Sequence, residues 1–303
     1  MLKDIRNILA WITKKTKDKS LPGFQGISVY KVASLFGKGL FEGKLGLRAS
    51  AIAFNFFLAI FPTILFFFTL IPYIPIHDFQ MNLLSLMEKI IPDKTYEAVQ
   101  TTIFDILTIP HTGLLSIGFL MALFFSTNGT HALIDSFNDT YHVIESRSWV
   151  KQRFTAIILV FILSLLTVVG IALLSFGSDG LKYLVQKGYL QGSYNLQFIQ
   201  FGRWLIIILI FLFSCSFLFY LAPAKRGKFR FISAGSILAT GLIILTSFGF
   251  NYYVDKFSRY NALYGSIGTL IIFLLWLYFS AWILLLGFEL NASIYSAKKD
   301  KSL

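Results

Sequence analysis

Residues 154–176 have the sequence FTAIILVFILSLLTVVGIALLSF, which no charged side chain and no proline interrupts. A helix needs about 20 mainly apolar residues to cross about 30 Å of hydrocarbon, so this stretch predicts a transmembrane helix. Five other stretches have the same character, and the six predicted spans are Ala49–Pro72, Gly113–Phe137, Phe154–Phe176, Trp204–Ala224, Phe231–Val254 and Tyr264–Ala292. The sequence therefore predicts an all-α, polytopic membrane protein, a bundle of six transmembrane helices.

The composition supports a membrane protein. Of the 303 residues 56% are hydrophobic and 14% are charged, which is more apolar side chain than a soluble domain of this size buries. The single cysteine, Cys215, lies inside a predicted span, so one chain can build neither a disulfide framework nor a cysteine-based zinc site. We expect lipid to solvate most of the chain.

The distribution of positive charge predicts the topology. The net charge of +12 would suggest a polyanionic partner in a soluble protein, but here Lys and Arg gather between the spans. With both termini in the cytoplasm, 20 of them lie on the inner side and seven on the outer side. The densest group is the predicted set of topology and lipid anchors, Lys225, Arg226, Lys228 and Arg230. A DNA-binding patch is the rival interpretation of this group, and the flanking spans weigh against it.

Two segments outside the spans are amphipathic. Residues 30–47 place apolar side chains at helical spacing with lysines between them, as in a helix lying on an anionic inner leaflet. The external link 73–112 predicts two short helices separated near Pro92. We therefore divide the chain into a basic tail with an interfacial helix (1–47), a membrane domain (48–297) and a short tail (298–303). Within the first span, Pro62 predicts a kink.

Polar residues inside the spans are candidate functional residues, because they are expensive in hydrocarbon. Glu289 lies near the inner end of the sixth span and Arg48 near the inner end of the first, so the two are predicted to form an ion pair. Asn55 lies on nearly the same helix face as Arg48 and deeper in the membrane. The alternative is an ordinary interfacial carboxylate at Glu289 that pairs with any neighbouring cation.

The second span carries a polar stripe. Five residues recur at spacings of three and four and share one helix face: Asn128, His131, Asp135, Asn138 and His142. This face either lines a wet cavity or lies beyond the membrane in solvent. His131, Asp135, Asp139 and His142 also have spacing that could hold a divalent metal, but the signal is weak and we predict no metal.

Catalytic motifs are absent from the sequence. It contains no Walker loop, no G-x-S-x-G elbow and no H-E-x-x-H motif. We expect neither an enzyme nor a bound cofactor, and no nucleic-acid partner.

The chain resembles the YihY/BrkB family of bacterial inner-membrane proteins over nearly its whole length. The matching motifs, in order, are Arg48–Phe54 with Phe61-Pro62, then Asn138, Tyr141, Glu145, Arg147 and Trp149, then Tyr220–Pro223, Tyr264–Gly268, Leu275–Tyr278 and Leu286–Ala292. The resemblance implies a six-helix protein of the bacterial inner membrane, for which a transporter or exporter function is suggested. The name ribonuclease BN, once attached to this family, is regarded as a misassignment.

Three functions follow from these observations. The first is a transporter of a small or amphipathic solute with a cytoplasm-facing polar cavity, for which the candidate residues are Arg48, Asn55, Asn128, His131, Asp135, Asn138, Glu289 and Asn291. The second is an envelope protein that acts through anionic phospholipid head groups and its amphipathic segments. The third and least favoured is a membrane nuclease.

The predicted topology can be tested with single cysteines in a Cys215→Ser background. Because residues 225–230 are predicted to be cytoplasmic, a membrane-impermeant thiol reagent should label Lys228→Cys only after the membrane is opened. Ser193→Cys, in the external link 177–203, should be labelled in intact cells. The reverse pattern would overturn the orientation.

Overall fold

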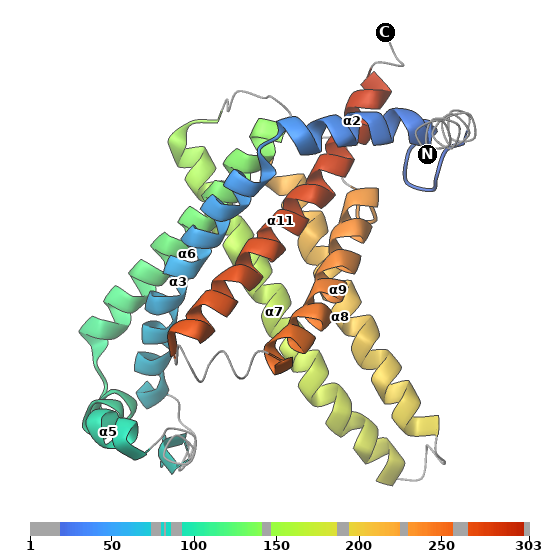
Figure 1. The fold of residues 1–303 in the computed structure, drawn as a ribbon. Coiled ribbons are helices and arrows are strands. Elements are labelled where there is room, and N and C mark those ends of the chain that lie inside the picture. The colour runs from blue at the N-terminus through green and yellow to red at the C-terminus, as the bar shows by residue number, and fades with distance from the viewer. Residues whose placement is uncertain are drawn as a thin grey trace. The chain divides into compact units, whose positions relative to one another are not determined.

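The computed structural model describes residues 19–73, 80–81, 83–85, 93–140, 147–186, 194–224, 230–256 and 266–299. Every named element in these residues is helical (Figure 1). The elements are α2 (Val29–Glu42), α3 (Leu45–Leu70), η1 (Ile71–Tyr73), α5 (Asp93–Thr108), α6 (Thr112–Thr140), α7 (Trp149–Gln186), α8 (Tyr194–Leu221), α9 (Ala234–Lys256) and α11 (Ser266–Lys299). The all-α prediction is confirmed.

Six of these helices are long and apolar enough to cross a membrane, which confirms the predicted number of spans. The candidate spans are Leu45–Tyr73, Thr112–Thr140, Trp149–Leu174, Gln200–Leu221, Ala234–Tyr253 and Leu270–Lys299. Several helices continue past the predicted ends, as α7 does to Gln186. Hydropathy detects only the part of a helix that suits hydrocarbon, whereas the hydrogen bonds that propagate the helix are the same in either solvent.

Helix-ending signals correct the predicted boundary between the fourth and fifth spans. The fourth span was predicted to reach Ala224, but α8 ends at Leu221, just before Pro223. Proline disfavours helical geometry in the residue that precedes it, so Ala222 leaves the helix. The fifth span was predicted from Phe231, but α9 begins at Ala234, where the Ser233 hydroxyl accepts from the Ser236 amide at 3.0 Å.

The predicted interfacial helix 30–47 is shorter than expected. It begins at Val29 after Ser28, whose hydroxyl accepts from the Lys31 amide at 3.4 Å, and it ends at Glu42. Gly43 then donates its N–H to Gly39 O, and Lys44 adopts a positive φ of 46°. A left-handed residue ends a helix, so residues 45–47 belong to α3 and not to α2.

The chain divides into two compact units, of which the first comprises residues 1–53 and 130–303. In this unit α2 lies across the C-terminal part of α11 (Figure 1). Their contact is an apolar cluster built around Ile27, Val32, Ile294 and Ala297. Helices α7, α8, α9 and α11 pack in succession, with Cys215, Ala239, Ile243 and Ile283 buried together.

The crossing of α9 and α11 depends on two glycines. A methyl group at Gly235 would collide with the backbone oxygen of Gly287, and one at Gly287 would lie 2.6 Å from the backbone oxygen of Gly235. Small residues at a crossing let two membrane helices approach closely and gain van der Waals contact. This contact places the C-terminal half of α11, which carries Glu289, against α9.

The second unit comprises residues 54–129. Here the last turns of α3 pack on the first part of α6, where a methyl group at Gly118 would come within 3.3 Å of the Phe66 backbone. α3 continues as a helix through Pro62, so this proline does not break the span. The second predicted external helix is present as α5. Pro92 and most of the first predicted external helix lie outside the described residues.

Substitution at Gly235 tests the close crossing. Gly235→Ala should lower the free energy of unfolding by about 1–3 kcal/mol, because the backbone of α11 must move away. Gly241→Ala is the matched control, since no atom lies within 4 Å of the added methyl group on the same helix. The readout is the midpoint of thermal unfolding in detergent. Equal midpoints for the two variants would contradict a tight crossing.

Candidate functional site

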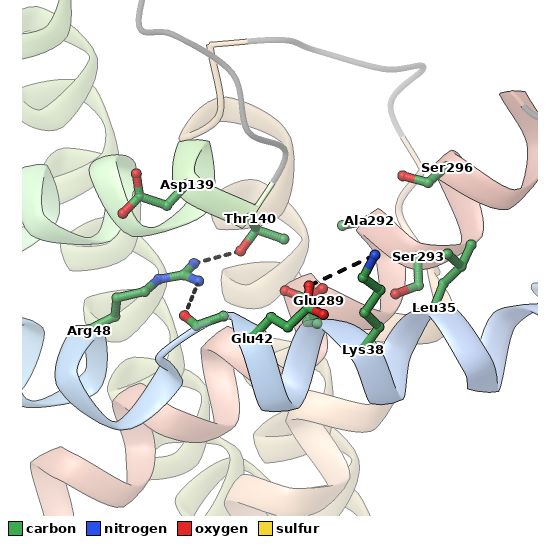
Figure 2. Close-up of a pocket in the computed structure, with 12 residues that line it drawn as sticks. Leu35, Lys38, Glu42, Arg48, Asp139, Thr140, Glu289, Ala292, Ser293 and Ser296 are labelled. Carbon is green, nitrogen blue, oxygen red and sulfur yellow. Dashed lines mark hydrogen bonds and ion pairs between the residues drawn. The ribbon is translucent and has the colours of Figure 1, made fainter.

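A polar pocket of about 250 Å³ lies within the first unit (Figure 2). Its walls are α2, the first turn of α3, the last turn of α6 and the C-terminal part of α11. The residues that line it are Leu35, Lys38, Gly39, Glu42, Gly43, Arg48, Asp139, Thr140, Glu289, Ala292, Ser293 and Ser296. Most of these side chains are charged or carry a hydroxyl group, although three of the four helices are candidate membrane spans.

Helix α11 supplies one face of the pocket. Glu289, Ala292, Ser293 and Ser296 have spacings of three and four residues, so they lie on one side of the helix. The Glu289 side chain is only 6% exposed. A methyl group at Gly39 would collide with its carboxylate, so glycine in α2 allows the two helices to enclose Glu289.

Arg48 joins three segments of the pocket. Its Nη1 donates to Gly43 O at 3.0 Å, and its Nη2 donates to Ser136 O and to Thr140 Oγ1, the latter at 2.5 Å. The guanidinium group therefore links the end of α2 and the start of α3 to the last turns of α6. The planar fork of arginine suits several fixed acceptors at once, because its donors are rigidly spaced.

Two carboxylates favour the charge of this cation electrostatically. Asp139 and Glu289 both interact electrostatically with Arg48, so the predicted partners Arg48 and Glu289 do lie in one pocket. At the rim, Lys38 Nζ and Glu42 Oε2 lie 3.9 Å apart, and both side chains are about two-thirds exposed. Such an exposed pair contributes little to stability. The pocket thus combines two cations with three carboxylates.

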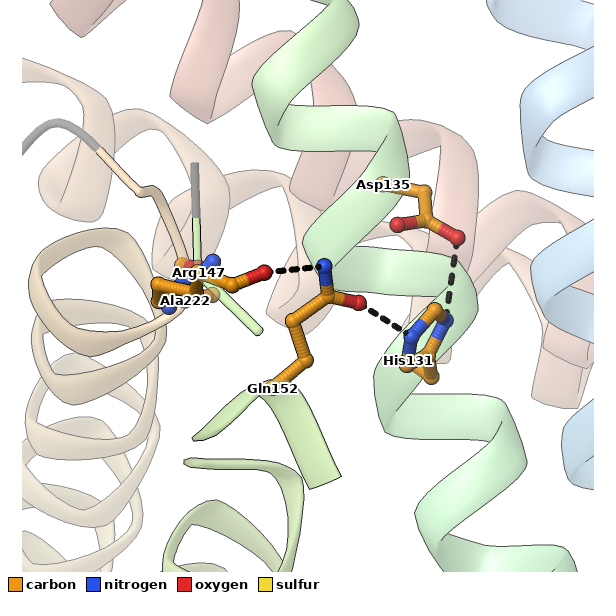
Figure 3. Close-up of polar contacts among 5 residues, drawn as sticks. All are labelled: His131, Asp135, Arg147, Gln152 and Ala222. Atoms are coloured by element: carbon orange, nitrogen blue, oxygen red, sulfur yellow. Dashed lines mark hydrogen bonds and ion pairs between the residues drawn. The ribbon is translucent and has the colours of Figure 1, made fainter. Parts of the chain in front are cut away.

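The polar stripe of α6 makes contacts elsewhere. His131 Nδ1 lies 3.0 Å from Asp135 Oδ2, and His131 Nε2 lies 2.8 Å from Gln152 Oε1 of α7 (Figure 3). Gln152 in turn donates to Arg147 O at 3.2 Å. These bonds tie α6 to the start of α7, and neither His131 nor Asp135 lines the pocket.

Two further polar side chains hold the end of α8. Asn138 Oδ1 accepts from the Ala224 amide at 2.8 Å, and Arg147 Nη2 donates to Ala222 O at 2.9 Å. The last carbonyl groups of a helix lack partners within the helix, and a cation near them is favourable. Asn138 and Arg147 therefore stabilise the turn that follows α8.

Asn291 stabilises the start of α9, the helix that follows α8 in the chain. Its Oδ1 accepts from the Gly235 amide at 2.9 Å and its Nδ2 donates to Ser233 Oγ at 3.0 Å. The first N–H groups of a helix need such acceptors. Asn291 thus fastens the N-terminus of α9 to α11 and is not among the residues that line the pocket.

The remaining predicted residues are placed as follows. Asn55 and Asn128 are half-buried and belong to the second unit. Arg230 is exposed, whereas Lys225, Arg226, Lys228 and His142 lie outside the described residues. Within the described ranges, no three His, Cys, Asp or Glu side chains are grouped closely enough to hold a metal ion.

The sequence analysis did not single out several residues of the pocket. They are Lys38, Glu42, Thr140, Ser293 and Ser296. Ser293 and Ser296 follow Glu289 at four and seven residues, a spacing from which the polar face of α11 was recognisable. No local sequence pattern indicated that α2 lines the pocket, because this depends on a contact between segments about 250 residues apart in the sequence.

Residues 38–302 match the protein family named Virulence factor BrkB. The chain belongs to the BrkB family. Among its relatives, "Putative ribonuclease-like protein YfkH" of Bacillus subtilis is 32% identical over 252 residues, which cover 83% of this chain and 90% of the relative. A UPF0761 membrane protein of Coxiella burnetii is 26% identical over 267 residues, 86% of this chain and 91% of the relative. No solved structure matches.

These matches confirm the family that the sequence resembles. Together with the six candidate spans, they also confirm that the chain is a multi-pass membrane protein. The structure adds what the resembling residues do in this BrkB chain. Asn138, Arg147 and Asn291 make contacts at helix ends, whereas Arg48 and Glu289 lie in the pocket.

Arg48→Lys tests the junction at the pocket. A single ammonium group cannot reach Gly43 O and the acceptors of α6 together, so the free energy of unfolding should fall by about 1–3 kcal/mol although the charge is kept. The readout is the thermal midpoint in detergent. Lys38→Arg, at an exposed pair, is the control and should leave the midpoint unchanged. An unchanged thermal midpoint for Arg48→Lys would show that the forked guanidinium group is not needed for stability.

Proposed function

We propose that this BrkB family protein is a transporter or exporter of a small or amphipathic solute, and that the solute binds in the polar pocket. The observation that supports the proposal is a cavity of about 250 Å³ that holds a buried carboxylate and an arginine between candidate membrane spans. Charged groups there are costly, and they mark solute pathways in many membrane proteins.

The dimensions of the pocket favour a small solute. Small-molecule sites usually have volumes of about 300–1,000 Å³, and this pocket lies just below that range. Its lining also includes the apolar side chains of Leu35 and Ala292, which can contact a short hydrocarbon portion of a solute. A nucleic-acid chain would not fit, and we propose no such partner.

We further propose that the protein is not an enzyme and needs no cofactor. The sequence lacks the motifs of hydrolytic and phosphoryl-transfer enzymes, and the Nη groups of Arg48 are already bonded to protein oxygens. The proposed location is the bacterial inner membrane with both termini in the cytoplasm, as the distribution of Lys and Arg favours.

A second candidate function is interaction with lipid at the membrane surface. Phe41 at the end of α2 is 93% exposed and Leu47 is 72% exposed, with Lys44 between them in the sequence. Apolar and basic side chains in this arrangement suit an anionic bilayer surface. We propose anionic phospholipid as a partner of residues 41–47, where α2 ends and α3 begins, and this contact is compatible with transport.

Blocking the pocket tests the transport proposal. The purified protein is reconstituted into liposomes loaded with a mixture of amino acids, amines, sugars and short carboxylic acids, and the solutes that leave are measured by mass spectrometry. The wild type should release at least one solute faster than protein-free liposomes. Ser296→Trp should abolish this release, because the indole ring fills the pocket.

Ser50→Trp is the matched control, since Ser50 is an exposed serine of α3 outside the pocket and the substitution adds the same volume. It should release solute as the wild type does. Release that Ser296→Trp leaves unchanged, or no release of any solute by the wild type, would refute the proposal.

A further inference from the structure

The charges of the pocket are unequal. Lys38 and Glu42 face each other at the exposed rim and offset one another. Elsewhere in the pocket, one cation, Arg48, interacts with two carboxylates, the exposed Asp139 and the buried Glu289. The pocket therefore carries one negative charge in excess when these groups are ionised.

Arg48 is poorly placed to bind an anionic solute. Its two Nη groups donate to Gly43 O, Ser136 O and Thr140 Oγ1. The Nε group is buried and has no hydrogen-bond partner among the described residues. A solute carboxylate or phosphate at the Nη groups would have to displace these bonds and would also meet Asp139 and Glu289. Opposite charge attracts and like charge repels more strongly where water is scarce, so the burial of Glu289 increases this discrimination.

The opposite wall offers oxygen acceptors and an apolar surface. Glu289 is held by its packing on Gly39, and the hydroxyl groups of Ser293 and Ser296 lie on the same face of α11. An ammonium group has three N–H donors and no acceptor, so carboxylate and hydroxyl oxygens can satisfy all of them. Leu35 and Ala292 provide contact for a short alkyl chain.

We infer that the pocket binds a small organic cation of the primary-amine class, with Glu289 and Asp139 as the carboxylates that recognise its ammonium group. This inference rests on the proposed function, because it names the class of solute for the same pocket. It goes beyond that function in predicting the sign of the solute's charge.

Three probes of equal chain length separate charge from size: n-butylammonium chloride, butyramide and sodium butyrate. The full-length protein is placed in nanodiscs of phosphatidylcholine at fixed ionic strength and neutral pH, and its thermal midpoint is followed against probe concentration. Butylammonium should raise the midpoint in a saturable manner. Butyramide and butyrate should not.

Variants assign the effect to the pocket. Glu289→Gln should weaken the apparent affinity for butylammonium by about tenfold, since a charge-assisted hydrogen bond is lost. Asp139→Asn, at an exposed side chain, should weaken it as well and serves if Glu289→Gln does not fold. Asp105→Asn, in α5 of the second unit, is the control and should bind as the wild type does.

The outcomes separate this inference from the proposed function. Saturable binding of butyrate or butyramide in place of butylammonium, or binding that neither Glu289→Gln nor Asp139→Asn weakens, would overturn the inference. If liposomes then still release a neutral or anionic solute and Ser296→Trp blocks this release, the transport proposal is retained and only the inference of a cationic solute is rejected. Butylammonium binding that depends on Glu289, with no solute released, would support the cation site and refute transport.

Discussion

The Arg48 guanidinium group is the interaction around which the pocket is organised. A cation at the end of a membrane helix is tolerated when its donors and its charge are both satisfied. Here both Nη groups reach protein oxygens, Gly43 O, Ser136 O and Thr140 Oγ1, whereas Nε is buried without a hydrogen-bond partner in the described part of the chain, and Asp139 and Glu289 favour the charge electrostatically. The contacts of this one side chain bring together parts of α2, α3, α6 and α11, and the pocket is the space between them.

The other helix ends of the first unit follow the same rule. Backbone groups at a helix end lack partners within the helix, and water is not freely available to replace them close to hydrocarbon. Asn138 and Arg147 bond to the turn after α8, and Asn291 bonds to the start of α9. Three of the polar residues on which the resemblance to the family rests therefore hold helix ends in place. Fewer residues remain as candidates for contact with a solute.

Helix α2 contributes both to the pocket and to the proposed lipid contact. Its apolar face packs on α11 through Val32 and Leu35, and Gly39 brings its backbone against the buried Glu289. Phe41, on the last turn, remains exposed. In the proposed function, the helix that closes one side of the solute site is thus also the helix that touches lipid.

The sequence by itself determined the six spans, because hydropathy is a property of a continuous run and needs no knowledge of neighbours. It also indicated α2, α5 and the charged ends of the first and sixth spans. Only the tertiary structure decided which polar residues meet. His131, Asp135 and Asn138 share one face of α6, yet Asp139 and Thr140 line the pocket, because each residue turns the helix by about 100° and selects a different neighbour. Those neighbours come from segments far apart in the chain, so no local pattern could identify them.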